Sequence, residues 1–533
     1  MERDEKRVSH HFPESAYSFL VSRFLADQLV RYPYPMNHTL TELTERLAVI
    51  SDLHEAASLL SWDQHTYMPP GATAARGQQL ATLSKLSHQL FTDAEIGKLL
   101  TVLESAPLAS DSDEAALVKV TRRLYDRASK LPADFVEEFA KLRTQAQQRW
   151  AEARRGKDFS QFAPLLQEIV AMTRREADYL GYLDHPYDAL LDGYEPGMRT
   201  AEVKRVFAEL KGPIVALVQA IKAQGRLSDA PLRQPFDEAK QEAFALEMAQ
   251  AFGYDLSRGR LDRTVHPFAQ SISKYDVRIT TRYNPEYLVP ALFGTLHETG
   301  HALYEQGVAD EYYRSPLGSV QSLGLHESQS RLWENLVGRS RGFWQYAYPK
   351  LRAYFPGLNG VPLEEFYAAI NRVEPSFIRV EADEVTYNLH IMLRFELELA
   401  LLEGTLAVSD IPAAWNAKVE EYLGITPPDD ALGCLQDIHW SMGGIGYFPT
   451  YTLGNVMSVQ LFEAAKRAHP EIDLDITEGR FATLLAWLRD NVHRHGAKYQ
   501  ADELLQRATG SRLDPGPYIG YLTSKYRTLY RLA

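Results

Sequence analysis

The chain has 533 residues, 45% of them hydrophobic and 24% charged, and a formal net charge of −13. The negative charge argues against nucleic acid or an anionic membrane surface as the main partner. Cys434 is the only cysteine, so no intrachain disulfide can form, which fits a reducing cytoplasm. No apolar run reaches the ~18 residues that a membrane span requires. We therefore expect a soluble, cytoplasmic protein.

Residues 1–36 differ in pattern from the rest of the chain. They carry charges, aromatic residues and prolines without a helical period. Their short apolar run is interrupted by charges and precedes no small-residue cleavage site, so they make a poor signal peptide. We expect a loosely held or disordered N-terminal extension.

Residues 37–260 are predicted to be almost entirely helical, because apolar residues recur at three- and four-residue steps with charges between them. Breaks rich in proline and glycine divide this pattern into successive helices. The polar stretch from Trp62 to Thr66 ends the first long helix, where it caps the helix or lines a cavity.

A different pattern occupies residues 262–283. The stretch from Asp276 to Tyr283 alternates and is rich in β-branched residues, which predicts a short strand or hairpin. An exposed strand edge can bind an extended peptide as an added strand. An ordinary connecting hairpin explains the pattern equally well.

The next segment, Leu296–Leu303, has the sequence LHETGHAL, a His-Glu-x-x-His motif in an apolar helical frame. In a helix, His297 and His301 project from one face about a turn apart, which suits two ligands of a tetrahedral zinc ion. Glu298 can take a proton from an attacking water and pass it to a leaving amine. An accidental match on a buried helix is the alternative, so the motif requires supporting context.

A second helix is predicted around Leu325–Asn335. It carries Glu327, 26 residues after His301 (327 − 301). A carboxylate from a second helix completes the ligands of His-His-Glu zinc proteases and leaves the fourth position for water. An exposed helical glutamate fits the spacing equally well. Glu334, on the same face, could instead be the ligand or a partner of one.

The remaining chain is predicted to return to helix at 363–425 and again at 455–533. Arg379 lies among acidic residues, a context typical of a surface ion pair. The segment between these helical regions contains clustered glycines and aromatic residues, including Tyr447. This combination predicts close approach of the backbone and a shaped loop.

Six segments in this order resemble the carboxypeptidase Taq family of zinc metallocarboxypeptidases. They are His266-Pro267-Phe268, Asp276-x-Arg278-x-Thr280, His297-Glu298-x-x-His301, His326-Glu327-Ser328-Gln329, Ile378-Arg379-x-x-Ala382-Asp383 and Gly433-x-x-Gln436-Asp437-x-His439-Trp440. The resemblance covers residues 37–533. One such segment would be weak evidence, but six in order are highly specific.

The resemblance implies a mainly α, neurolysin-like fold with a small β-sheet near the metal. A deep substrate groove would separate a helical half at 37–260 from a catalytic helical half at 261–533. The resemblance also implies a homodimer that acts on peptides. One Zn2+ per chain would be bound by His297, His301 and Glu327, and Co2+ or Mn2+ could replace it.

The implied reaction is the release of single C-terminal amino acids with broad specificity, with Glu298 as base and then acid. Tyr447 and His439 are the candidate donors to the oxyanion, although Tyr447 could instead be a packed aromatic residue. An arginine fork matches the two oxygens of a terminal carboxylate. The resemblance does not decide between Arg278 and Arg379. The other candidate substrate-binding residues are His266, Asp276, Thr280, Gln436 and Asp437.

Two other classes of function remain open from the sequence. One is a helical zinc endopeptidase or a dipeptide-releasing carboxypeptidase with the same groove. The other is a non-catalytic helical binding protein. The intact Glu298 argues against the latter, since a structural metal site has no use for a base.

Overall fold

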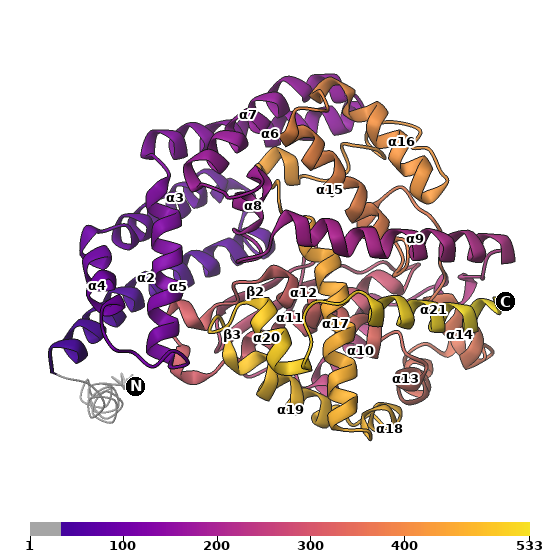
Figure 1. Ribbon diagram of the computed structural model, residues 1–533. Helices are drawn as coiled ribbons and strands as arrows, with labels where there is room; N and C mark the ends of the chain where they lie inside the picture. Colours follow the sequence, from indigo (N-terminus) through magenta and orange to yellow (C-terminus); the bar gives the residue numbers. More distant parts are fainter. Residues whose placement is uncertain (1–33, 533) are drawn as a thin grey trace, which may run out of the picture.

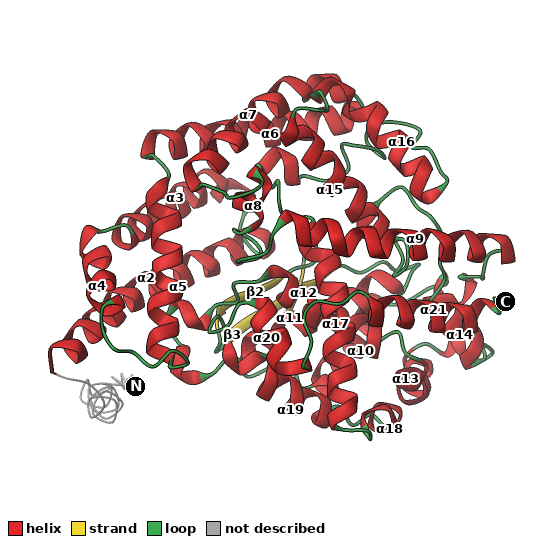
Figure 2. Cartoon of the chain, viewed as in Figure 1, coloured by secondary structure: helices red, strands yellow, loops and turns green. Residues whose placement is uncertain are grey.

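The computed structural model describes residues 34–532, with side chains from residue 37 onward. This part of the chain is mainly helical, with one small sheet among the helices (Figures 1 and 2). The predicted extension at 1–36 lies outside the described residues except for 34–36, which begin the first described helix. No helix in the described range is both long and apolar enough to cross a membrane.

The elements follow one another in three groups. The helices before the sheet are α2 (Tyr34–Thr66), α3 (Thr73–Phe91), α4 (Ala94–Glu104), α5 (Asp113–Lys130), α6 (Ala133–Gly156), α7 (Ala163–Leu180), α8 (Pro186–Leu191), α9 (Thr200–Gln224) and α10 (Glu238–Phe252). The strands are β1 (Leu261–Arg263), β2 (Ala269–Ser273) and β3 (Asp276–Thr281). The helices after the sheet are α11 (Val289–Gly307), α12 (Leu323–Arg331) with a π-helix (Leu332–Val337) directly after it, α13 (Arg341–Tyr354), α14 (Leu363–Ile370), α15 (Tyr387–Glu403), α16 (Ile411–Leu423), α17 (Pro449–Ala468), α18 (Ile472–Thr477), α19 (Ala482–Asn491), α20 (Ala501–Thr509) and α21 (Gly516–Tyr530).

Helices α2, α4 and α5 form an arm with its own small hydrophobic core, at the indigo and purple side of Figure 1. Its apolar residues recur at helical spacing, for example Leu43, Leu47 and Ile50 on α2. The same core includes Val308 and Tyr312, which follow α11. Packing of these residues ties the arm to the helix that carries the His-Glu-x-x-His motif.

A much larger core runs through the rest of the chain, from Phe135 on α6 to Tyr530 on α21. It is continuous across residue 260, because buried residues of α9 and α10 pack with those of α11 to α21. The predicted halves, 37–260 and 261–533, therefore share one core. The groove expected between them remains a prediction.

The sheet lies directly before the motif helix, as the alternating pattern predicted. Its order is β1-β3-β2, with β3 parallel to β1 and antiparallel to β2. Val277, Ile279 and Thr281 alternate along β3 on its buried side, and the Thr281 hydroxyl donates to the carbonyl of Ala291 on α11 at 3.2 Å. The sheet thus supports α11.

Two glycines allow α11, α12 and α17 to pack closely. A Cβ at Gly300 on α11 would lie 2.5 Å from the carbonyl oxygen of Gln329 on α12. A Cβ at Gly454 on α17 would lie 2.7 Å from Cβ of Glu327. Real Cβ atoms do not approach so closely, so both positions require glycine to bring these helices together.

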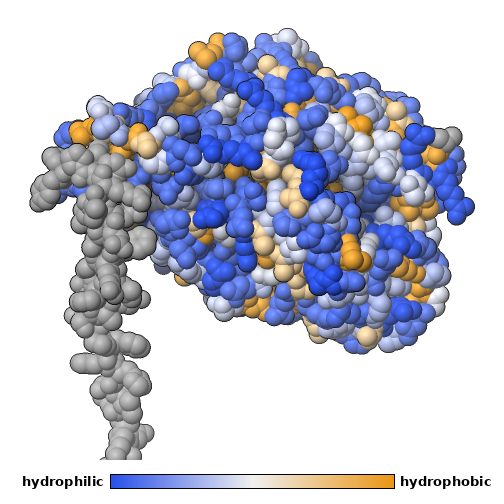
Figure 3. Space-filling view, turned by 60° about the horizontal axis from the view of Figure 1, so that its bottom comes forward, coloured by the Kyte–Doolittle hydropathy of each residue, from blue (hydrophilic) through white to orange (hydrophobic). Residues whose placement is uncertain are grey.

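The face of the molecule shown in Figure 3 is mostly hydrophilic, and its hydrophobic side chains are scattered among polar ones. Scattered exposed apolar residues are normal on globular proteins. Surface hydropathy therefore gives no indication of a binding site on this face.

Candidate metal centre and substrate site

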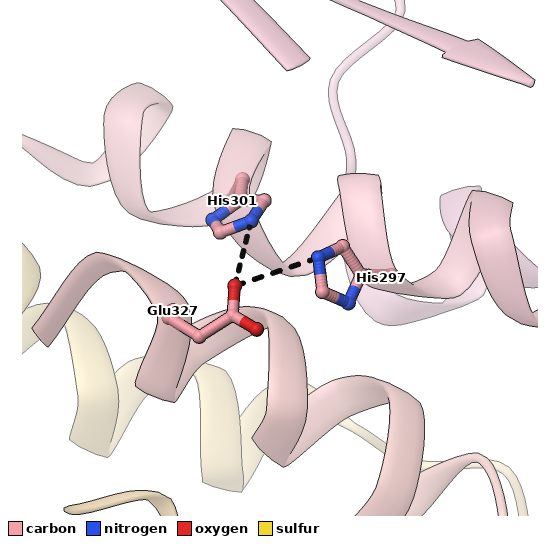
Figure 4. A group of neighbouring side chains, drawn as sticks. All are labelled: His297, His301 and Glu327. Carbon is pink, nitrogen blue, oxygen red and sulfur yellow. Dashed lines mark ion pairs between the residues drawn. The ribbon is translucent and has the colours of Figure 1, made fainter. Parts of the chain in front are cut away.

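Three side chains converge where α11 and α12 pack: His297 and His301 from α11, and Glu327 from α12 (Figure 4). Nε2 of His297 lies 3.6 Å from Oε2 of Glu327, and Nε2 of His301 lies 3.5 Å from the same oxygen. Within the described residues, no other group of three His, Cys, Asp or Glu side chains is close enough to hold a metal ion. The structure thus brings together the three predicted ligands.

The donor atoms fit a small divalent cation. With metal–ligand bonds of about 2.0–2.1 Å, neighbouring donors of a tetrahedral site lie about 3.4 Å apart, close to the two measured separations. Two imidazole nitrogens and one carboxylate oxygen leave a fourth corner for water or substrate, as in catalytic zinc sites. Imidazole and carboxylate ligands also suit other transition metals, so the geometry alone does not select the ion.

Glu334 contacts His297, one of the three predicted ligands, and is not one of the three converging groups. Its Oε2 lies 2.9 Å from Nδ1 of His297. An N–H at Nδ1 that donates to this carboxylate leaves the lone pair of Nε2 for a metal. Glu334 lies on the π-helix after α12, in which the N–H of Gly338 donates to the carbonyl of Trp333. Such π-turns are frequent at functional sites.

Glu298, the predicted base, is 6% exposed and adjoins His297. Burial raises the pKa of the Glu298 carboxyl to about 7. A group with a pKa in this range can both accept and release a proton near neutral pH. Its position and acidity therefore suit an acid–base role beside the predicted metal ligands.

His439 and Tyr447, which precede α17, form a cluster with Tyr451 in the first turn of α17. Ring centroids of His439 and Tyr447 are 5.2 Å apart, and those of Tyr447 and Tyr451 are 5.4 Å apart. Burial, together with the charge of Glu327, raises the pKa of Tyr447, so its hydroxyl keeps its proton at neutral pH. Burial lowers the pKa of His439 to about 4. Tyr451 was not predicted, although its spacing of four residues from Tyr447 was a signal.

Arg379 lies in a 3-10 turn before α15 and is only 5% exposed, so the surface ion pair considered for it is wrong. Its Nε and Nη2 donate to Oδ1 of Asp437 at 3.1 and 2.8 Å. Its Nη1 donates to the hydroxyl of Tyr387 at 2.9 Å. The ring centroid of Tyr451 lies 4.9 Å from its Cζ. Arg379 is therefore a buried cation beside the aromatic cluster.

Gln436 and Asp437, both predicted to bind substrate, are engaged by the protein around Arg379. Asp437 also accepts from Nε of the fully buried Arg394 at 2.7 Å. Oε1 of Gln436 accepts from the backbone N–H of Arg379 at 2.8 Å, and its Nε2 donates to the carbonyl of Phe377 at 2.9 Å. These contacts position Arg379.

Arg278 lies on another element, the central strand β3. Its Nε and Nη2 donate to the two oxygens of Asp276 at 2.8 and 2.7 Å, and its Cζ lies 4.4 Å from the ring centroid of Trp62 on α2. Among the described residues its Nη1 has no hydrogen-bond partner, so one end of the fork is available. Arg278 and Arg379 share no partner and do not form one cluster.

Thr280 and His266 differ in their surroundings. The buried Thr280 hydroxyl accepts from the N–H of Phe268 at 2.8 Å and donates to its carbonyl at 3.0 Å. This double contact holds the loop before β2 onto β3. His266 is exposed in that loop and is accessible to a ligand.

Two residues outside the predicted set connect the predicted metal ligands with Arg379. Arg331 donates from Nε to Oε1 of Glu327 at 2.6 Å and from Nη1 to Oε2 of Glu334 at 3.1 Å. Its Cζ lies 4.5 Å from the ring centroid of Tyr387, whose hydroxyl accepts from Arg379. Arg331 follows Glu327 by four residues, a spacing typical of helical ion pairs, whereas no local signal marked Tyr387.

The fold and this centre define a helical metallopeptidase, with two histidines, a glutamate from a neighbouring helix and a buried carboxyl beside them. The model of the carboxypeptidase Taq (M32) metallopeptidase family matches residues 42–526. The chain belongs to this family and is a metallocarboxypeptidase. The resemblance noted in the sequence is confirmed.

Similar proteins cover nearly the whole chain. Thermostable carboxypeptidase 1 of Thermus thermophilus is 44% identical over 510 residues, which are 93% of this chain and 99% of that protein. Carboxypeptidase 1 of Bacillus subtilis is 39% identical over 493 residues, 92% of this chain and 98% of that protein. The crystal structure of the M32 carboxypeptidase of Deinococcus radiodurans R1 has a TM-score of 0.91 at 43% identity and covers 93% of this chain and 100% of that one. The mainly helical fold is thereby confirmed.

Proposed function

We propose that the protein is a zinc carboxypeptidase that releases single amino acids from the C-termini of peptides with broad specificity. One observation carries this proposal: the metal ligand Glu327 and the buried cation Arg379 are joined through only two side chains, Arg331 and Tyr387. A cation so close to the hydrolytic centre can bind a terminal carboxylate while the last peptide bond reaches the metal.

Each group has a separate task in the proposed reaction. Zinc at the His297, His301 and Glu327 site would lower the pKa of a bound water and polarise the scissile carbonyl. Glu298 takes the proton of the attacking water and transfers it to the leaving amine. The Tyr447 hydroxyl or an N–H of His439 donates to the oxyanion.

Arg379 is proposed to be the main residue that binds the terminal carboxylate of the substrate. Asp437 and Arg394 fix the orientation of its guanidinium, and Gln436 fixes its backbone. Arg278, with one end of its fork available, is proposed to contact the substrate farther from the metal. The exposed His266 in the neighbouring loop is proposed to contact the substrate backbone.

We also propose that the protein is a homodimer in the cytoplasm. The resemblance to the family favours a homodimer, and the lone, buried Cys434 fits a reducing cytoplasm. Analytical ultracentrifugation would test the dimer, since a monomer at micromolar concentration would contradict it.

The decisive experiment measures amino-acid release from an N-blocked peptide with a free C-terminus and from its C-terminal amide. We expect the metal-loaded wild type to release single residues from the free acid only. Chelator should abolish release, and Glu298→Gln should lower kcat by about 10²–10⁴-fold, because the general base is lost while the ligands remain. Bound zinc in the inactive variant would be the control for an intact metal site.

The products separate this proposal from its rivals. Release of dipeptides, or internal cleavage of a peptide blocked at both ends, would indicate a different peptidase on the same fold. Zinc bound without release from any of several peptides would support a binding protein instead.

A further inference from the structure

Glu327 uses its two carboxylate oxygens for different partners. Oε2 faces the Nε2 atoms of His297 and His301, whereas Oε1 accepts from Nε of Arg331 at 2.6 Å. Figure 4 marks contacts with both histidines from one oxygen of Glu327 only. Carboxylates can bind a cation through one oxygen or through both. The partner of Oε1 therefore determines whether Glu327 occupies one coordination position of the metal or two.

Arg331 is held from more than one side and cannot easily release this oxygen. Its Nη1 donates to Glu334 at 3.1 Å, and its guanidinium packs 4.5 Å from the ring centroid of Tyr387. Its side chain is only 14% exposed. A planar fork that engages two carboxylates at once is pre-organised in a way that a lysine ammonium is not.

No other described cation duplicates this contact. Arg339 reaches Oε1 of Glu334 at 3.4 Å and the carbonyl of Ile370 at 2.5 Å, but it does not contact Glu327. Arg331 is thus distinguished from Arg339 by its bond to the metal ligand, while both place a positive charge beside Glu334.

We propose that Arg331 is a positioning residue that keeps Glu327 a one-oxygen metal ligand and so keeps the fourth corner of the site open for the attacking water. The positive charge of Arg331 weakens metal binding, and so does its hydrogen bond to Oε1, which keeps that oxygen off the metal. Arg331 therefore lowers the metal affinity but keeps the fourth coordination position open. This inference deepens the proposed zinc site and rests on it. A merely charge-balancing arginine would have no effect on the number of donor atoms.

The test compares zinc-loaded wild type with Arg331→Met, which has similar length but no hydrogen-bond donors. X-ray absorption spectroscopy and a crystal structure of the zinc form would count the oxygen donors from Glu327. Competition with a chromophoric chelator would give the zinc Kd. In Arg331→Met we expect both oxygens of Glu327 on zinc, a Kd no higher than that of wild type, and a kcat lower by about 10–100-fold.

Two variants serve as matched controls. Arg339→Met removes a similar cation beside Glu334 and should leave one-oxygen coordination unchanged. Arg331→Gln can still donate one hydrogen bond to Oε1, so it should retain more of the wild-type coordination, and it also serves if Arg331→Met fails to fold. Far-UV circular dichroism of the metal-free proteins would check the fold.

Specific results would overturn the inference. One-oxygen coordination in a folded Arg331→Met protein would refute it, and so would two-oxygen coordination in Arg339→Met, which would make charge alone responsible. A wild-type protein that does not bind zinc at His297, His301 and Glu327 would instead refute the proposed zinc site itself. The two failures are therefore distinguishable.

Discussion

At the scale of single residues, the two histidines proposed to bind the metal are supported in different ways. His297 has a carboxylate partner for Nδ1, whereas Nδ1 of His301 has no hydrogen-bond partner among the described residues. The His301 ring instead stacks on His326 at 4.2 Å between centroids, and Nε2 of His326 lies 3.1 Å from Oε1 of Glu305. Burial lowers the pKa of His301 to about 3, so this imidazole is neutral and its lone pair is available at pH 7.

The link between the metal ligands and Arg379 gives a prediction for Tyr387→Phe. This change removes the hydroxyl that accepts from Arg379 but keeps the ring that packs on Arg331. We expect KM for a free-acid peptide to rise about 10-fold, because one hydrogen bond that orients a charged donor is worth roughly 1–2 kcal/mol. Steady-state kinetics with peptides of increasing length would measure this effect.

The zinc Kd is the control for Tyr387→Phe and should not change. A fall in kcat with unchanged KM, or a loss of zinc, would show that the hydroxyl acts on the metal side of the link instead.

At the scale of elements, the close contact of α11 with α12 brings the three proposed metal ligands together. Because Gly300 lies against the backbone of Gln329 and Ser330, any side chain there must push α12, and Glu327 with it, away from His297 and His301. The glycine inside the His-Glu-x-x-His motif is thus a packing requirement.

Gly300→Ala is expected to lower the free energy of unfolding by about 1–3 kcal/mol, the usual cost of overpacking a buried contact. It should also weaken zinc binding, since the two helices separate. Urea unfolding of the metal-free protein and chelator competition would measure the two effects.

Gly294→Ala is the matched control on the same helix. A Cβ there would lie 3.7 Å from the Thr281 hydroxyl oxygen, an ordinary contact, so the change should be neutral or stabilising by up to about 1 kcal/mol. Equal destabilisation by both changes would contradict the packing argument.

At the scale of the whole molecule, buried carboxyls join distant segments. Oε2 of Glu195 accepts from the N–H of Gly324 at 2.9 Å at the start of α12. Oε2 of Glu398 on α15 accepts from the hydroxyl of Tyr187 at 2.7 Å. Burial raises the pKa of each carboxyl to about 7. Folding is thereby linked to proton uptake at these two carboxyls.

This linkage predicts the sign of the contribution that Glu195 makes to the pH dependence of stability. Between about pH 4.5 and 7 the Glu195 carboxyl ionises in the unfolded chain but not in the folded one, so the contribution of Glu195 to the free energy of unfolding falls as pH rises through this window. The shift corresponds to about 3 kcal/mol for Glu195. Glu195→Gln should reduce this fall, as measured by urea unfolding of the metal-free protein at pH 5 and pH 7.5.

Glu286→Gln, which alters an exposed carboxyl, is the control and should leave the pH dependence as in wild type. An identical pH dependence in wild type and Glu195→Gln would show that Glu195 is not the linked group.

Local geometry explains what could be predicted from the sequence. The three- and four-residue period predicted the helices, the alternation before β3 predicted the hairpin, and the i, i+4 spacing placed His297 and His301 on one face. Each of these follows from the fixed period of a helix or strand. By contrast, Glu327 fitted an exposed position equally well until the resemblance to a family favoured it as a ligand.

The sequence by itself thus determined the helical class, the His-Glu-x-x-His motif on one helix and, through six ordered segments, the family. Only the tertiary structure decided the partners of each polar group: it joined Asp437 to Arg394 across 43 residues and Arg331 to Tyr387 between α12 and α15. It also engaged Gln436 with the backbone around Arg379. The physical reason is that spacing along one element is fixed by backbone geometry, whereas contacts between elements exist only once the core has packed.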